Sequence, residues 1–144
     1  MKMTPWLVCL LIGAGTQISS AQSAPIQASL CELQRRAKQG EQRSVQVAGE
    51  FGPSGVLTDP TCDSDYTWVK WDLRSTANKE ALLSLLHSKR HVDVVFEGDF
   101  LGPPLPSPNL PEAIRKSYHP GWGHNGAFNT QLVVHVIRSV KAGK

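Results

Sequence analysis

Alternation of hydrophobic and polar positions dominates the middle and end of the chain and predicts five β-strands. The clearest segment is 91–100, where apolar residues and Gly98 alternate with three acidic residues and Val95. The segments 44–49, 56–58 and 66–73 carry the same or a shorter version of this pattern. The last segment, 131–140, is apolar on both faces. We therefore expect it to be a central or covered strand.

Two segments instead have apolar residues at helical spacing. Ser29 can cap a first helix that ends near Ala37, ahead of Gly40. Asn78 or Thr76 can cap a second helix that runs to residue 90. The second helix has an apolar stripe, which we expect to plug the sheet from one side; its members are Leu82, Leu85 and Leu86, extended by Ala81.

The order of these elements is helix, three strands, helix, two strands. A helix between the third and fourth of five strands is the order of an OB-fold barrel. Gly49 and Gly98 stand where a small barrel needs sharp bends. We predict a mainly β (α+β) protein: a five-stranded OB-like barrel with an N-terminal helix and a helix between strands three and four. The alternative is an open α+β sheet with the helix on one face.

The beginning of the chain has the features of a secretory signal peptide. Lys2 precedes an uncharged apolar run over 6–15, and small residues surround a cleavage site after Ala21. We expect a signal peptide at 1–21, a flexible lead-in at 22–28 and a single OB-like domain at 29–144. This organisation predicts an exported protein, periplasmic or secreted.

Export gives meaning to the cysteines. The chain has three, and Cys9 lies inside the expected signal peptide. The remaining pair, Cys31 and Cys62, is predicted to form a disulfide, because an even number of cysteines in an exported domain is typical of one.

Charge and hydropathy narrow the class of partner. The 15 Lys and Arg residues and 12 Asp and Glu residues give a net charge of +3. A balance so near neutrality disfavours a surface dedicated to phosphate groups, so nucleic acid is an unlikely partner. No further apolar run has the length of a membrane span. We expect no cofactor and no nucleophile or phosphate-binding motif.

A long segment, 102–129, separates the last two strands and contains six of the ten prolines. Long loops in small domains are usually either functional or disordered, and aromatic residues argue against disorder. We expect residues 111–116 to form one or two helical turns and the segment to fold back over the barrel. Together with the adjacent barrel face it would supply the aromatic ligand-binding candidates, which are Tyr66, Trp68, Tyr118, Trp122 and His124.

Three short motifs are distributed along most of the chain after the expected signal peptide. They are Val45–Glu50 (V-x-V-x-G), Leu57–Cys62 (L-x-D-P-x-C) and Gly121–His124 (G-x-G-H), the last ahead of Gln131–Val134. In these motifs the chain resembles small uncharacterised exported bacterial proteins with an OB-like fold. The resemblance implies a fold and no activity.

Two histidines of the long segment raise the possibility of a metal site. His119 and His124, with Asp59 if the shared motifs mark one site, could supply two imidazoles and a carboxylate. The simpler interpretation is that His124 hydrogen-bonds to a loop backbone or to Asp59. We therefore expect a non-enzymatic binding module for an envelope protein, peptide or glycan. A metal-dependent hydrolase and a purely structural envelope protein are the alternatives.

Overall fold

The computed structural model describes residues 23–63, 65–88 and 91–143. The expected signal peptide at 1–21 lies outside these residues, as do Lys89 and Arg90 at the expected end of the second helix. The elements in chain order are β1 (Ile26–Gln27), α1 (Leu30–Arg36), β2 (Gln42–Phe51), β3 (Val56–Thr58), β4 (Thr67–Trp71), α2 (Lys79–Ser88), β5 (Val92–Leu101), α3 (Glu112–Ser117), a 3₁₀ turn (His124–Gly126) and β6 (Thr130–Ala142).

Five of the strands close into a barrel. The strands are ordered β1-β2-β3-β4-β6-β5, and β5 pairs back onto β2 along its whole length. β4 and β6 are parallel, and the other pairs within the barrel are antiparallel. This is the OB-like barrel predicted from the order of elements, and the open-sheet alternative is wrong. β6, with apolar residues on both faces, lies between β4 and β5.

Two glycines allow neighbouring strands of the barrel to come close together. A Cβ atom on Gly49 would lie 2.6 Å from the carbonyl oxygen of Thr58 on β3. A Cβ atom on Gly98 would overlap the carbonyl of Val133 on β6, next to a shift in the β5–β6 register. Both residues therefore serve as the glycines at barrel bends that the sequence predicted, because the space at each position admits no side chain.

We predict that Gly98→Ala lowers the free energy of unfolding by about 1–3 kcal/mol, because the added methyl group forces the β5–β6 backbones apart. Ala48→Ser, which also adds one heavy atom but on the exposed side of β2, should change it by less than about 0.5 kcal/mol. Urea unfolding measures both. Equal midpoints for the two variants would mean that the bend tolerates a side chain.

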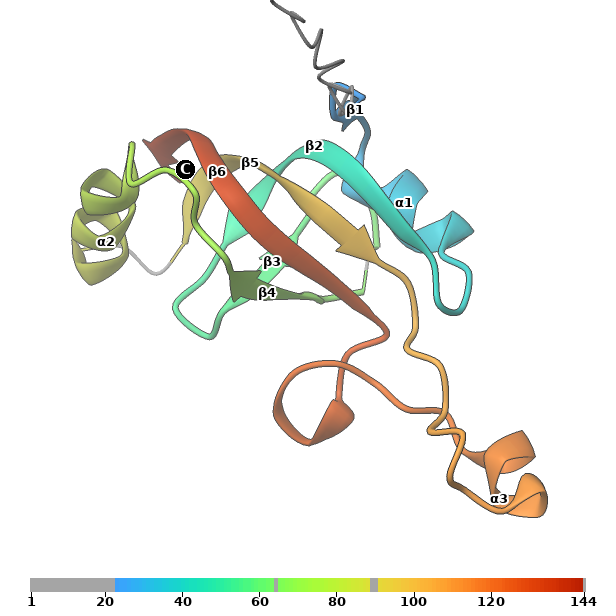
Figure 1. Ribbon diagram of the computed structural model, residues 1–144. Coiled ribbons are helices and arrows are strands. Elements are labelled where there is room, and N and C mark those ends of the chain that lie inside the picture. Colours follow the sequence, from blue (N-terminus) through green and yellow to red (C-terminus); the bar gives the residue numbers. More distant parts are fainter. Residues whose placement is uncertain (1–22, 64, 89–90, 144) are drawn as a thin grey trace, which may run out of the picture.

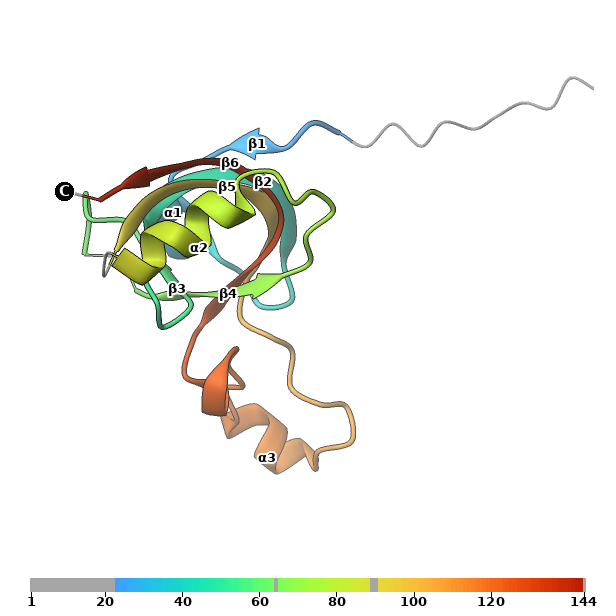
Figure 2. The same cartoon turned by 90° about the vertical axis from the view of Figure 1, so that its left-hand side faces the viewer.

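The two longer helices cover opposite ends of the barrel, as the two views in Figures 1 and 2 agree. α1 buries Leu30 and Leu33 in the core. α2 buries Leu82, while Leu85 and Leu86 pack against the core only in part. The expected plug is therefore present. Ala81, expected to extend the stripe, is exposed instead.

Ser29 and Asn78 both stand at the helix N-termini where the sequence placed them, and the Asn78 carbonyl accepts from the Leu82 N–H at 2.9 Å, but the Asn78 side chain bonds elsewhere. The Ser29 hydroxyl accepts a hydrogen bond from the backbone N–H of Glu32 at 3.1 Å, as predicted. Asn78 precedes α2 with a φ of 63°, a left-handed conformation that asparagine tolerates. Its side-chain amide donates to the carbonyls of Ile137 and Arg138 at 3.0 and 3.2 Å. Asn78 therefore ties α2 to β6 instead of capping the helix with its side chain.

The expected flexible lead-in, 22–28, is partly a strand. Ile26 and Gln27 pair in parallel with Val45 and Gln46, and the N–H of Ala28 donates to the Gln46 carbonyl at 3.2 Å. The pairing occupies an edge of β2 that would otherwise leave backbone groups without partners. Because the hydrogen bonds come from β2, two residues with no pattern of their own can form a strand.

The segment 102–129, which we call the arm, is held at its base. The Gly40 N–H donates to the Pro103 carbonyl at 2.8 Å, and the Gln39 side chain donates to the Pro104 carbonyl at 3.1 Å. Beyond this base the arm, with the predicted helix α3 near its end, projects away from the barrel in both views (Figures 1 and 2). The expectation that it folds back over the barrel is wrong: among the described residues, its hydrogen bonds and ring contacts with the rest of the chain come from residues 102–104 and Phe128 at its base.

Candidate functional site

An open hollow of about 660 Å³ lies on the outer surface of the barrel along β3. Val56 and the aromatic rings of Tyr66 and Phe128 supply apolar and aromatic lining, and Asp59 and Asp63 line its acidic side. Val56 pairs directly with Trp68 of β4, so their side chains lie on the same face. This is the face on which OB folds bind oligomeric ligands. We call the surface formed by Val56, Asp59, Asp63, Tyr66 and Phe128 the acidic hollow.

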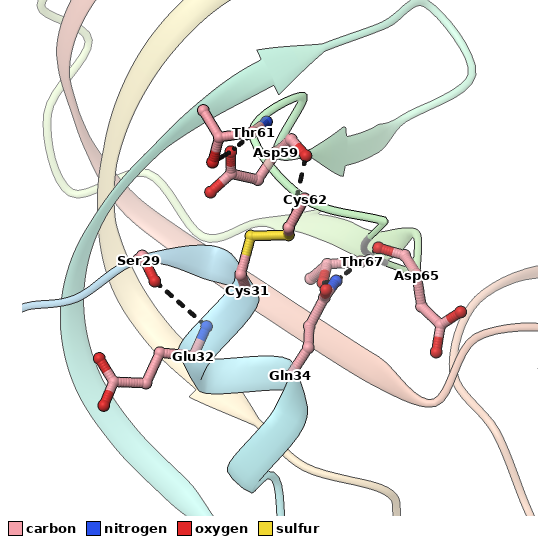
Figure 3. The surroundings of a disulfide bond; sticks show 9 residues. All are labelled: Ser29, Cys31, Glu32, Gln34, Asp59, Thr61, Cys62, Asp65 and Thr67. Carbon is pink, nitrogen blue, oxygen red and sulfur yellow. Dashed lines mark hydrogen bonds between the residues drawn. A yellow bond between two sulfur atoms is a disulfide. The ribbon is translucent and has the colours of Figure 1, made fainter.

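A disulfide fixes the wall of the hollow. Cys31 on α1 is bonded to Cys62 in the β3–β4 connection, with the two Cα atoms 6.4 Å apart (Figure 3). Beside it, the Asp59 carboxylate accepts hydrogen bonds from the N–H and hydroxyl of Thr61 at 3.0 and 2.6 Å. The predicted pairing is confirmed, and it ties the N-terminal helix to the loop that bears both aspartates of the hollow.

Below the disulfide a polar chain links α1 to two strands. The Gln34 amide donates to the carbonyl of Asp65 at 2.5 Å and to the hydroxyl of Thr67 at 2.7 Å (Figure 3). The Thr67 hydroxyl in turn lies 2.8 Å from that of Thr130 on β6. The Thr67–Thr130 bond is buried, and the bond to Asp65 holds the backbone just before β4, where Tyr66 stands. Tyr66 is 60% exposed.

Trp68, one of the predicted ligand-binding aromatics, is covered by the base of the arm. Its ring stacks on Phe128 with centroids 5.4 Å apart and planes 28° apart. A Cβ atom on Gly123 would lie 2.7 Å from both rings, so glycine is what lets the arm approach this closely. Trp68 therefore supports the floor beside the hollow, and Tyr66 and Phe128 present the accessible aromatic surface.

The other three predicted ligand-binding residues, Tyr118, Trp122 and His124, lie on the arm. The indole N–H of Trp122 donates to the Gly102 carbonyl at 2.8 Å, and two backbone hydrogen bonds join Trp122 to Phe128. Trp122 thus closes the base of the arm. His124 is exposed in the 3₁₀ turn, and Tyr118 is 50% exposed farther out. The predicted set is divided between the barrel face and the arm rather than forming one surface.

The suggested metal ligands do not come together. Within the part of the chain that the structure describes, the group of three potential ligands at metal-binding spacing is Cys31, Asp59 and Cys62. Its two sulfur atoms are already joined in the disulfide. Neither His119 nor His124 belongs to this group, and both are exposed.

Sequence reasoning missed a polar cluster on the outside of the barrel. The His135 ring on β6 lies between two aspartates, with Nε2 2.9 Å from a carboxylate oxygen of Asp99 on β5 and Nδ1 3.1 Å from the carbonyl of Asp72 after β4. Burial lowers the pKa of His135, but the hydrogen bonds to Asp99 and Asp72 outweigh it and raise that pKa above its usual value of 6.5. Finding this cluster from the sequence would have required the register of the β5–β6 pair, which the pattern of a single strand does not contain.

This cluster predicts a pH dependence of stability. Because the folded-state pKa of His135 is raised, its stabilising contribution is fully present below pH 6.5 and is lost as the pH rises through the folded-state value. The urea concentration at the midpoint of unfolding should therefore decrease as the pH is raised from mildly acidic to mildly alkaline. His135→Gln should flatten that dependence, whereas the exposed His119→Gln should leave it unchanged. If the unfolding midpoints of His135→Gln and of the wild type changed equally with pH, His135 would not be the source of the pH dependence.

Comparison with known proteins finds no matching family model, no similar curated protein and no similar solved structure. Among the described residues, no helix is long and apolar enough to cross a membrane. The site therefore has to be interpreted from its own geometry.

Proposed function

We propose that this chain is an exported, non-enzymatic binding module that holds an extended, basic peptide segment of an envelope protein in the acidic hollow. The observation that carries the proposal is the combination, in one open hollow, of an exposed tyrosine and apolar lining with aspartates at the side. Rigid aromatic groups give contact area at a small cost in conformational entropy, and charges at a rim select the partner.

Charge distinguishes the classes of ligand. Asp59 and Asp63 line the hollow, and Asp65 is exposed in the same connection. Within residues 23–63, 65–88 and 91–143, Asp63 and Asp65 have no salt-bridge partner. Although His91 also lines the hollow, the two aspartates there would repel phosphate groups and attract Lys and Arg. A basic peptide is thus favoured over nucleic acid, in agreement with the nearly neutral net charge.

The disulfide supports the proposed compartment. Disulfides persist in oxidising environments such as the periplasm and the cell exterior. The bond also holds the loop with Asp59 and Asp63 in place before any ligand arrives. A wall that is already ordered costs less conformational entropy on binding.

Nuclear magnetic resonance titration tests the proposal and maps the site. The probes are a short peptide of repeated Lys-Leu-Ser, its Glu-Leu-Ser counterpart, single-stranded oligothymidine and a neutral chitooligosaccharide. We expect saturable shifts from the basic peptide at Val56, Tyr66 and Phe128, and none from the acidic peptide or the oligothymidine. Binding of the oligosaccharide alone would replace peptide by sugar as the ligand class. Shifts outside the hollow would contradict the site.

A further inference from the structure

The outer part of the arm carries an apolar stripe that the barrel does not cover. Ile114 lies on α3 and Tyr118 at its C-cap four residues later, so these two lie along one side of the helix. Leu110 is half-buried and precedes Pro111, the N-cap of α3. Ile114 is 51% exposed and Tyr118 is 50% exposed. Exposed large apolar groups gathered on a projecting element mark an interaction surface more often than scattered ones do.

The stripe has a basic edge. Arg115 follows Ile114 and has no salt-bridge partner in the described part of the chain. Lys116 pairs with Glu112 at 2.8 Å, but both side chains are largely exposed, so this pair is weak. We call the surface formed by Leu110, Ile114, Arg115 and Tyr118 the arm tip.

We infer that the arm tip of one molecule docks in the acidic hollow of a second copy of this chain. The inference rests on the proposed function and names its partner. The two surfaces complement each other: the tip offers Ile114, Tyr118 and the positive charge of Arg115, and the hollow offers apolar and aromatic lining beside Asp63. Apolar contact would supply affinity, and the Arg115–Asp63 pairing would fix the orientation.

Two other acceptors for the tip fit less well. A groove of about 350 Å³ between α2 and the turn before β3 is more apolar, with Trp71 40% and Leu83 51% exposed. Lys79 lines that groove, however, and would repel Arg115. The molecule's own hollow is the second candidate, but the arm projects away from the barrel (Figures 1 and 2).

The contact joins two different surfaces, and this determines the assembly. If two molecules exchange arm tips reciprocally, the product is a closed dimer; if each tip enters the next molecule, an open chain grows. In both cases the hollow is filled by protein, so association and capture of an external peptide compete.

Sedimentation velocity over a wide range of protein concentration tests the inference. We expect reversible association of the wild-type protein. Asp63→Arg and Arg115→Asp should each weaken it at least about tenfold. The double variant, in which the two charges are exchanged within every copy, should restore it. Lys38→Asp reverses an exposed charge outside both surfaces and should leave association unchanged apart from screened long-range effects.

Outcomes against the inference are equally defined. A monomer at every concentration would overturn it. Association that ignores both charge reversals but disappears in Leu83→Ser would assign the contact to the groove beside α2 instead. Ile114→Ser separates this inference from the proposed function: it should abolish association while the Lys-Leu-Ser peptide still binds. If the folded wild-type protein did not bind the peptide at all, that result would instead count against the hollow as a ligand site.

Discussion

Replacing Cys31 and Cys62 together by serine will lower the free energy of unfolding by about 3–4 kcal/mol. The bond joins residues 31 positions apart, and opening a loop of this length restores chain entropy to the unfolded state by that amount. For a domain of this size the loss is a large share of the total stability. Urea unfolding of the double variant, beside the wild-type protein with and without reductant, measures it.

The same variant should also lose peptide binding beyond what its stability explains. Cys62 holds the loop that carries Asp59 and Asp63, so a cleaved bond releases one wall of the hollow even in molecules that remain folded. Reduced wild-type protein is the matched control and should behave like the double serine variant. If the double serine variant lost less than about 1 kcal/mol of its free energy of unfolding, the remaining contacts of α1 would be holding the loop without the bond.

Leu82→Ala will lower the free energy of unfolding by about 2–5 kcal/mol. Leu82 is 2% exposed and is the residue through which α2 enters the core at its end of the barrel. Removing its side chain leaves a cavity that the closed barrel cannot collapse to fill.

Leu83→Ala is the matched control, because Leu83 is the next residue of the same helix and is 51% exposed. Its substitution should cost less than about 0.5 kcal/mol. Leu85→Ala, at a half-buried position, should fall between the two. Equal effects of Leu82→Ala and Leu83→Ala would mean that α2 does not plug the barrel.

The barrel was predictable because its signals are local. Alternation over 91–100 places every second side chain in the core, and the structure buries Val92, Val94 and Phe96 accordingly. The position of α2 between the third and fourth barrel strands then selects the OB-like connectivity. Ser29 could be recognised as a cap because capping chemistry involves residues three apart.

What escaped prediction depends on contacts distant in sequence. β1 forms because β2 offers an edge, and Asn78 bonds to carbonyls 59 and 60 residues away. His135 meets Asp99 and Asp72 only once three chain segments lie side by side. The candidate site divided for the same reason: strand pairing places Val56 and Trp68 on one face, whereas the arm, which carries Tyr118, projects away from the barrel.

The affinity of the Lys-Leu-Ser peptide for matched charge variants tests the central claim, that the acidic hollow is the binding site, most directly. Calorimetric titration should give saturable binding to the wild-type protein, weakened about tenfold by Asp63→Asn and more by the pair Asp63→Asn and Tyr66→Ala. The Glu80→Gln variant, which lacks an exposed acid on α2, should bind the peptide as the wild type does. Equal affinities for Asp63→Asn, Glu80→Gln and wild type, or no binding to any of them, would contradict the account.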